Sequence, residues 1–369
     1  MLDKYKYWIW LSSIPGVGAV KSKKLIEYFI EPYNIFTAKE IDLASLSFLS
    51  RTDIANILNE EYRVNIDRHI ENIIANDIKI ITMDDENYPE YLKDIYDPPL
   101  ILYMKGNLQR KDKYLAVVGS RRATSYGLNM AEVVSRELSK CGITVVSGMA
   151  RGIDTYAHRG VLGAKGRTVA VLGCGLDIVY PYENKKLMEE IIENGACISE
   201  YLPGTQPLSG NFPARNRIIS GMSMGVIVIE AGEKSGSLIT ANFALEQGRE
   251  VFALPGNVNS LNSTGTNRLI KEGAKMVTSI DDILEEIGAF FSESNRDSFT
   301  KKLKDDKLLE GLDDDEVKIV ECLKLEPAHI DNIAIKTGLN IKTVNSVIVM
   351  LELKGIVEQT PGKIYKLKL

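Results

Sequence analysis

The stretch YLAVVGSRR (residues 114–122) decides the fold, because an apolar run passes directly into glycine, serine and two arginines. Such runs are typical of strands in a parallel sheet that helices cover on both faces. Six more runs occur, at residues 78–82, 143–147, 168–172, 196–199, 226–229 and 251–254. Segments of helical length separate most of them, for example at 126–140, 183–194 and 238–247. This alternation predicts a doubly wound α/β domain with an extended, Rossmann-like parallel sheet.

The regions on either side of this domain have a different pattern of apolar and polar residues. Residues 1–66 indicate helices joined by short loops, which predicts an N-terminal all-α domain. The α/β domain then spans 67–288, and the polar, charged residues 289–309 are interpreted as a linker. Residues 310–369 pattern as three amphipathic helices followed by a short hairpin. That order predicts a C-terminal winged helix.

Composition and charge restrict the class of protein. The 369 residues suit two or three domains. No apolar run approaches the roughly 20 residues that span a bilayer, and no signal peptide is recognised, so we expect no membrane partner. The 4 cysteines form no C-x-x-C pair, as expected of buried thiols in a reducing cytoplasm. The net charge of −5 argues against a polyanionic partner, yet screening confines a charge's reach to about 10 Å, so a local cluster of arginines can still bind one.

Glycines, hydroxyl groups and arginines gather directly after several of the expected strands. The loops are 119–127, 147–154 and 173–177, followed later by 212–217 and 235–240. Ligands of open α/β sheets bind at the carboxyl ends of the strands, so these loops are expected to meet. Glycines allow close approach of a ligand, N–H groups at helix N-termini bind phosphate oxygens, and arginines add bidentate charge. We therefore predict an anion site in preference to purely structural turns.

The motifs of the common nucleotide cofactors are missing, and we expect no cofactor and no metal. Residues 173–178 (GCGLDI) lack the third glycine of the dinucleotide fingerprint, and no Walker loop is present. Asp154 and His158 lie four residues apart and could form an acid/base pair. We favour instead an acidic first-turn residue and a histidine packed against the sheet. Glu200 and Glu230 could act on a substrate or could pair with the loop arginines.

Several ordered motifs cover most of residues 78–280. They are VGSRRATSYG (118–127), SGMARGIDTYAH (147–158), VAVLGCGLDIVYP (169–181), FPARNRIISG (212–221), EAGEKSGSLITA (230–241), GREVFALPGNV (248–258) and GTNRLIKEGA (265–274). Together they resemble the DprA/Smf family of bacterial DNA-processing proteins. The resemblance implies a Rossmann-like domain that binds single-stranded DNA and a homodimer. It also implies that the protein loads the recombinase RecA onto the strand during natural transformation, with no catalytic reaction.

The resemblance also implies which residues meet the DNA. They are Gly119, Ser120, Arg121, Arg122, Ser147, Gly148, Arg151, Lys186 or its neighbour Lys185, Arg215, Asn216 and Arg217. Phe212 is a candidate for base stacking, with a place in the core as the alternative. Trp8 and Trp10 are expected in the core.

The two ends and two rival functions stay open. The run at 14–18 (IPGVG) with the lysines that follow resembles the helix-hairpin-helix of a sterile-alpha-motif-like domain, and it either binds phosphate or is a solvated turn. The last helix, 341–354, has no arginine for base edges, which makes duplex recognition a weak hypothesis. The first rival function is a Rossmann-type nucleotide glycosidase with Glu230 or Asp154 as its acid/base, although the P-G-G-x-G-T run is absent. The second is a duplex-binding regulator built on the winged helix.

Overall fold

A computed structural model describes residues 3–109, 112–288, 312–325, 327–360 and 362–368. The chain divides into two compact units, Met1–Phe290 and Phe291–Leu369. The expected linker at 289–309 lies outside the described residues. Within the described ranges, no helix is long and apolar enough to cross a membrane.

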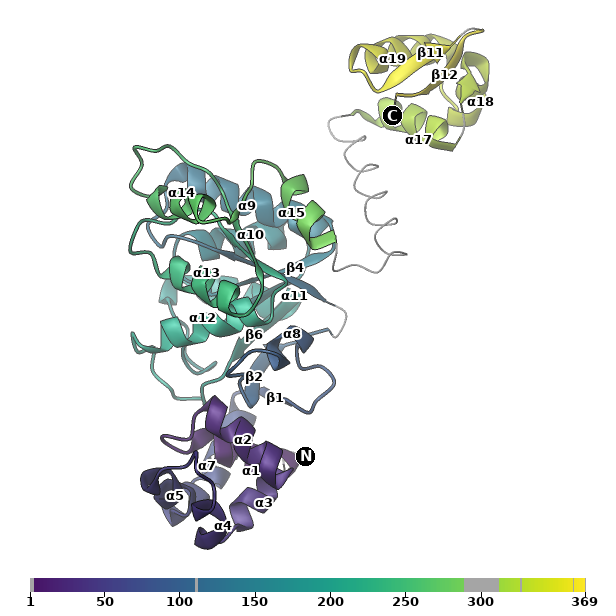
Figure 1. The fold of residues 1–369 in the computed structure, drawn as a ribbon. Coiled ribbons are helices and arrows are strands. Elements are labelled where there is room, and N and C mark those ends of the chain that lie inside the picture. The colour runs from purple at the N-terminus through teal and green to yellow at the C-terminus, as the bar shows by residue number, and fades with distance from the viewer. Residues whose placement is uncertain (1–2, 110–111, 289–311, 326, 361, 369) are drawn as a thin grey trace. The chain divides into compact units, whose positions relative to one another are not determined.

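The first unit is built on a sheet that has nine strands within the described residues (Figure 1). In spatial order they are β1 (Lys79–Thr82), β2 (Ile101–Gly106), β6 (Gly195–Ser199), β5 (Thr168–Val171), β4 (Ile143–Ser147), β3 (Lys113–Val118), β7 (Gly225–Val228), β8 (Glu250–Ala253) and β9 (Lys275–Met276). From β6 to β9 all neighbours are parallel. The predicted fold class, a Rossmann-like α/β domain with a helical N-terminus and a winged helix, is confirmed.

One edge of the sheet departs from the expected parallel arrangement. β1 pairs antiparallel with β2, and β2 pairs antiparallel with β6. The run at 78–82 therefore forms a strand, as predicted, but not a parallel one. Antiparallel strands at the edge of a parallel sheet are common, and they need no helical crossover between them. The apolar segment that forms β2 follows Asp97-Pro98-Pro99 and was not predicted as a strand.

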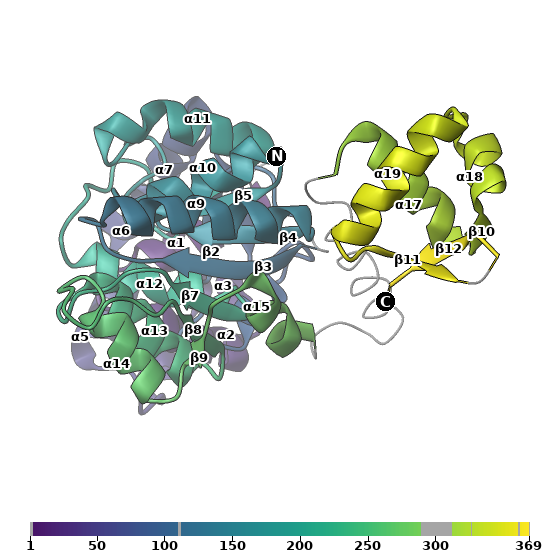
Figure 2. The same cartoon turned by 90° about the horizontal axis from the view of Figure 1, so that it is seen from above.

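The chain changes direction across the sheet at β3. Successive strands β3 to β6 progress towards one edge, and the chain then returns to add β7 on the other side of β3. Helices α9 (Ser125–Lys140), α10 (Ile153–Gly163) and α11 (Lys185–Asn194) cover one face, while α12 (Asn211–Gly221), α13 (Gly236–Glu246) and α14 (Thr264–Lys271) cover the other (Figure 2). Among the described residues, the last helix of the unit is α15 (Ile280–Ile287). The carboxyl ends of the paired strands β3 and β7 therefore mark a topological switch point, where doubly wound sheets bind their ligands.

Apolar packing on both faces holds the sheet. Along β5, Val169 and Val171 belong to one buried cluster and Ala170 to the other, as the alternation of side chains along a strand requires. The N-terminal helices share the cluster of Ala170, to which the fully buried Trp10 also belongs. Trp8 is buried as well, which confirms both tryptophans as core residues.

The N-terminal helices are short. They are the 3-10 turn Asp3–Tyr5 and helices α1 (Lys6–Ser13), α2 (Ala19–Phe29), α3 (Pro32–Thr37), α4 (Glu40–Ala44), α5 (Arg51–Ile57), α6 (Glu60–Val64) and α7 (Ile66–Ala75). Lys21, in the first turn of α2, reaches back to the hairpin that connects α1 to α2. Its ammonium donates to the Gly16 carbonyl at 3.1 Å and to the buried Asp53 carboxylate at 2.7 Å. This lysine therefore stabilises the hairpin.

The second unit has the elements of a winged helix. They are α17 (Asp314–Leu325), β10 (Ala328–His329), α18 (Ile330–Thr337), α19 (Ile341–Leu353), β11 (Val357–Thr360) and β12 (Ile364–Leu367). The unit has its own core, in which Ile333, Ile348 and Leu351 are almost completely buried. The short strand β10 pairs with β12 and was not predicted.

Candidate nucleic-acid interface

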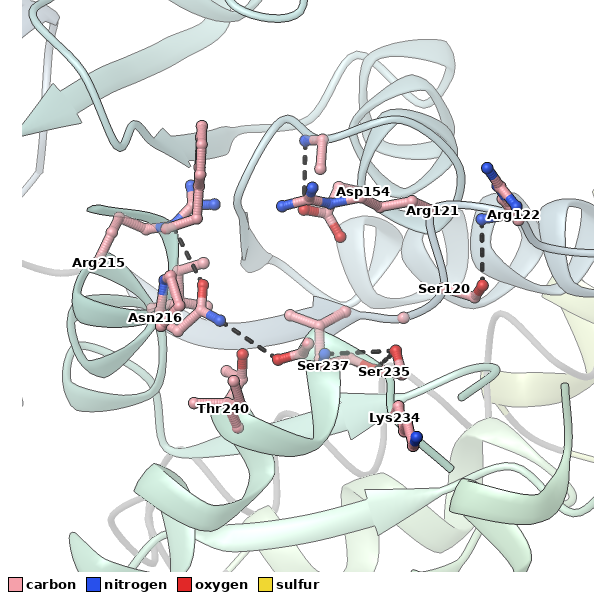
Figure 3. A pocket seen from close by; sticks show the side chains of 18 of the residues that line it. Ser120, Arg121, Arg122, Asp154, Arg215, Asn216, Lys234, Ser235, Ser237 and Thr240 are labelled. Carbon is pink, nitrogen blue, oxygen red and sulfur yellow. Dashed lines mark hydrogen bonds between the residues drawn. The ribbon is translucent and has the colours of Figure 1, made fainter. Parts of the chain in front are cut away.

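A cleft of about 660 Å³ opens at the carboxyl ends of β3 and β7 (Figure 3). Its walls come from the loops after these two strands and from the starts of α12 and α13. The polar lining residues are Ser120, Arg121, Arg122, Asp154, Ser209, Arg215, Asn216, Lys234, Ser235, Ser237, Thr240 and Asn262. The position matches the switch point of the sheet, and the volume is that of an ordinary ligand site.

The loop after β3 is held in place by Glu230, which follows β7. The Ser120 amide donates to the Glu230 carbonyl at 2.7 Å. The Glu230 carboxylate accepts from the Thr124 amide at 2.9 Å and from the Thr124 hydroxyl at 2.6 Å. Gly127 leaves room for this carboxylate, since a Cβ there would lie 2.4 Å from Glu230 Cδ. Both carboxylate oxygens of Glu230 are thus engaged in shaping the loop that carries Arg121 and Arg122.

The start of α10 supports the same loop from the other side. Gly152 has a φ of 77°, and a Cβ there would lie 2.3 Å from the Ser120 carbonyl oxygen. Only glycine fits both this backbone conformation and this approach. The Ile153 amide donates to the same Ser120 carbonyl at 3.2 Å, which fixes the serine against α10.

Two aromatic rings and one arginine form a wall of the cleft. The Arg121 guanidinium lies 5.4 Å from the centre of the Phe212 ring, and the Tyr180 ring lies 5.3 Å from Phe212. Phe212 is half-buried and lines the cleft, so it is not a core residue. Arg121 is exposed. Stacking on the ring orders a side chain that would otherwise move freely.

Arg215 lies buried at the floor of the cleft. Its guanidinium donates to the Gly148 carbonyl at 2.9 Å and also to the Val171 carbonyl. Burial lowers the pKa of Arg215 to about 10, opposed by the charge of the neighbouring Asp154. The Asp154 carboxylate accepts from the Gly148 and Ala150 amides at 3.2 and 3.3 Å, and burial raises its pKa. The floor thus combines one cationic and one acidic group, with the exposed arginines above it.

His158 does not take part in this cluster as an acid or base. It is fully buried, and its Nδ1 lies 2.7 Å from the Thr168 hydroxyl on β5. The Thr168 hydroxyl donates to the Val145 carbonyl, so the histidine Nδ1 carries the hydrogen. Burial lowers the pKa of His158 to about 3, which leaves the ring neutral. The interpretation of His158 as packed against the sheet is confirmed.

The chain is similar to proteins of a known family. A family model described as DNA recombination-mediator protein A matches residues 79–288, and a DprA winged helix model matches residues 304–363. The chain belongs to the DNA recombination-mediator protein A family. Protein Smf of Synechocystis sp. is 35% identical over 389 residues, which cover 98% of either chain. The predicted resemblance to the DprA/Smf family is confirmed.

Two solved DprA structures are similar to this chain. The X-ray structure of DprA from Streptococcus pneumoniae has a TM-score of 0.69 and 41% identity, over 76% of this chain and 97% of that one. DNA processing protein A from Helicobacter pylori, described for its unique single-stranded DNA binding mode, has a TM-score of 0.53 and 32% identity. That match covers 59% of this chain and 99% of the other.

Some residues that the DprA motifs suggested do not line the cleft itself. Ser147 is buried and donates to the Val117 carbonyl at 2.7 Å. Arg151 lines a smaller hollow of about 40 Å³ that shares Arg121, Phe212 and Arg215 with the cleft. Lys185 and Lys186 are exposed at the start of α11 and line neither hollow.

Arg217 also lies outside the cleft, where its buried side chain forms two ion pairs. It donates to Asp97 at 2.9 Å and to Glu200 at 2.6 Å, and its side chain is only 8% exposed. The motif FPARNR was expected in a loop, but it forms the first turns of α12. Residues two apart on a helix do not face the same way, so Arg215 and Arg217 diverge. Glu200 thus pairs with an arginine, which was one of the two roles expected for it, the other being to act on a substrate.

The sequence placed the hydroxyl-bearing run 235–240 among the loops of the predicted anion site, but it did not single out Lys234. Lys234, Ser235, Ser237 and Thr240 line the cleft opposite the Arg121 loop (Figure 3). The Ser235 hydroxyl caps α13 by accepting from the Ser237 amide at 3.4 Å. Thr240 is 1% exposed and lines the cleft. The sequence signal that identifies Lys234 is its position directly before the start of a helix.

Proposed function

We propose that the cleft binds single-stranded DNA by its phosphates. One observation carries the proposal. The switch between β3 and β7 brings Arg121, Arg122 and Arg215 into one cleft with Lys234 and the start of α13. Guanidinium groups, and the free N–H groups of a first helical turn, are the donors that bind phosphate best. Family membership and the single-stranded DNA binding described for the H. pylori relative support it.

The aromatic wall favours a single strand over a duplex. Bases of a single strand can turn away from their backbone and stack on a ring, and Phe212 offers such a ring beside Arg121. Bases of a duplex are already stacked and paired, so stacking on Phe212 would first require unpairing. We therefore expect single strands to bind more tightly than a duplex of equal length.

The test replaces the exposed arginine. Arg121→Ala should weaken the binding of a fluorescently labelled oligonucleotide by about 10- to 100-fold, the usual effect of losing a charged hydrogen bond. It should also reduce the slope of log affinity against log salt by about one. Anisotropy titrations at several salt concentrations measure both. Arg136→Ala is the matched control, because Arg136 lies on α9, pairs with Glu132 at 2.7 Å and does not line the cleft. Equal binding by the two variants would contradict the proposed site.

The proposal extends to recombination. The protein, as a cytoplasmic homodimer, holds the strand and passes it to RecA, and no covalent bond changes at the cleft. The family's description as recombination mediators supports this role. RecA-dependent strand exchange on strands coated with single-strand-binding protein should be stimulated by the protein and not by Arg121→Glu. Light scattering should give a dimer mass.

The glycosidase alternative has a separate test. We expect no free base from nucleoside monophosphates, because Glu230 is engaged with Thr124. Turnover that disappears in Glu230→Gln would favour the enzyme.

A further inference from the structure

The loop between β8 and α14, residues 255–263, carries two unusually exposed aliphatic side chains. Val258 and Leu261 are each 83% exposed, more than the other large apolar side chains of the described residues. Single exposed apolar residues are ordinary on protein surfaces. Here two of them share one short loop, and that loop adjoins the cleft.

The loop is firmly held. Within it, the Ser260 amide donates to the Asn257 carbonyl and the Ser263 amide to the Ser260 carbonyl, at 2.9 and 3.0 Å. At its base, the Asn267 side chain exchanges two hydrogen bonds with the Gly256 backbone, at 3.1 and 3.0 Å. The exposure of Val258 and Leu261 therefore belongs to a defined conformation.

The loop is continuous with the proposed DNA cleft. The Asn262 amide group donates to the Arg122 carbonyl at 3.1 Å, and Asn262 itself lines the cleft. On the β7 side, a Cβ placed on Gly232 would lie 3.2 Å from the Leu261 carbonyl oxygen. Leu261 thus sits beside two segments that form the cleft wall.

The chemistry of the loop differs from that of the cleft. The sequence PGNVNSLNS (255–263) has no charged residue, so it offers little to a phosphate. It offers aliphatic surface together with asparagine amides and serine hydroxyls. That combination suits a nucleobase, which has an apolar face and an edge of hydrogen-bond donors and acceptors.

We propose that the loop 255–263 is a base-contacting rim, on which bases of the bound strand lie against Val258 and Leu261. The inference rests on the proposed function, because the strand must first enter the cleft. Phosphates bind in the cationic cleft, and the next bases turn outward over Arg122 onto the rim. The rim adds affinity that depends on bases and not on charge.

The double variant Val258→Ser/Leu261→Ser tests the rim. Both side chains are exposed, so the variant should keep the wild-type urea midpoint. Its affinity for an oligothymidylate should fall by about five- to tenfold, because two aliphatic side chains lose part of their apolar contact with the bases. The slope of log affinity against log salt should not change, because no phosphate contact is lost. An abasic strand of equal length should bind the variant and the wild type equally.

The matched control is Leu245→Ser, which removes a 60% exposed leucine of α13 that does not line the cleft. If the double variant binds oligothymidylate as tightly as this control, the proposal that bases contact the rim is wrong, while the proposed function stands. An equal loss on the abasic strand would also overturn the rim. A changed oligomeric mass in the variant would identify the loop as an interface between copies instead. Failure of the wild type to bind any strand would overturn the proposed function and the rim together.

Discussion

At the scale of single residues, one carboxylate competes with the DNA that we propose. Glu183 accepts hydrogen bonds from Arg151 through both of its oxygens, one of them at 3.1 Å. Both side chains are exposed, at 65% for Arg151 and 51% for Glu183. A DNA phosphate would compete with Glu183 for the Nε and Nη2 donors of this guanidinium. The ion pair should therefore reduce the affinity of Arg151 for a phosphate.

Removal of this carboxylate should strengthen DNA binding. Glu183→Gln is expected to raise the affinity for single strands by about two- to fivefold, the gain from one exposed ion pair that no longer competes. Arg151 holds the pKa of Glu183 down to about 2. Lowering the pH from 8 to about 5 leaves Glu183 charged, so the gain should not vary over that range. Anisotropy titrations measure it, with Glu189→Gln as a control that removes the same charge from an exposed site on α11. Identical affinities for the two variants would sink the idea of competition.

Residue patterns predicted some residues of the cleft and not others, for a physical reason. Glycine, serine and arginine directly after a strand placed Arg121 and Arg122 correctly in the cleft, because strand ends converge at one edge. Arg217 could not be distinguished from Arg215 without knowing that both lie on a helix. Lys234 gave no repeated pattern, since its place in the cleft depends on the crossover to β7.

At the scale of elements, the position of α12 depends on Arg217. This side chain joins α12 to Asp97, in the segment before β2, and to Glu200, just after β6. Arg217→Ala would leave Glu200, whose side chain is only 18% exposed, without its partner. We expect the free energy of unfolding to fall by about 3–5 kcal/mol, as when one member of a buried ion pair is removed.

Urea denaturation of the first unit measures this effect. The control is Arg268→Ala, which removes an exposed partner of Glu272 on α14 and should cost less than about 1 kcal/mol. A loss for Arg217→Ala no larger than for the control would show that these ion pairs do not anchor α12.

Strands were easier to predict when both of their faces are buried. β4 and β5 give continuous apolar runs, because helices cover both sides of the sheet. β9 and β10 have two residues each, too few for any pattern to show. Consecutive strands pair from β3 to β6, but the pairing of β3 with β7 joins distant segments, and local sequence contains no record of it.

At the scale of the whole molecule, the two units suggest a division of labour. The cleft lies entirely within the first unit. In the winged helix, α19 exposes Val349, Met350 and Leu353, at 53%, 50% and 78%, and these apolar groups suit a protein partner better than phosphate. The net charge of −5 is compatible with a DNA partner, since the arginines and the lysine of the proposed site are gathered in one cleft.

Deletion of the second unit tests this division. A chain ending at Phe290 should bind single strands within about twofold of the full chain, as expected of independent sites. Duplex binding should be equally weak in both chains, and anisotropy with matched single and double strands compares them. A clear loss of duplex binding on deletion would instead favour the regulator built on the winged helix.

The switch at β3 also has a consequence for the synthesis of this protein. Thr124, just after β3, is clamped by Glu230, which is 106 residues further along the chain. At about 5–20 residues per second, the ribosome needs about 5–20 s to make that segment. During this interval β3 lacks its β7 neighbour, and half of the cleft does not exist. A nascent chain therefore completes the proposed DNA-binding cleft only late in translation.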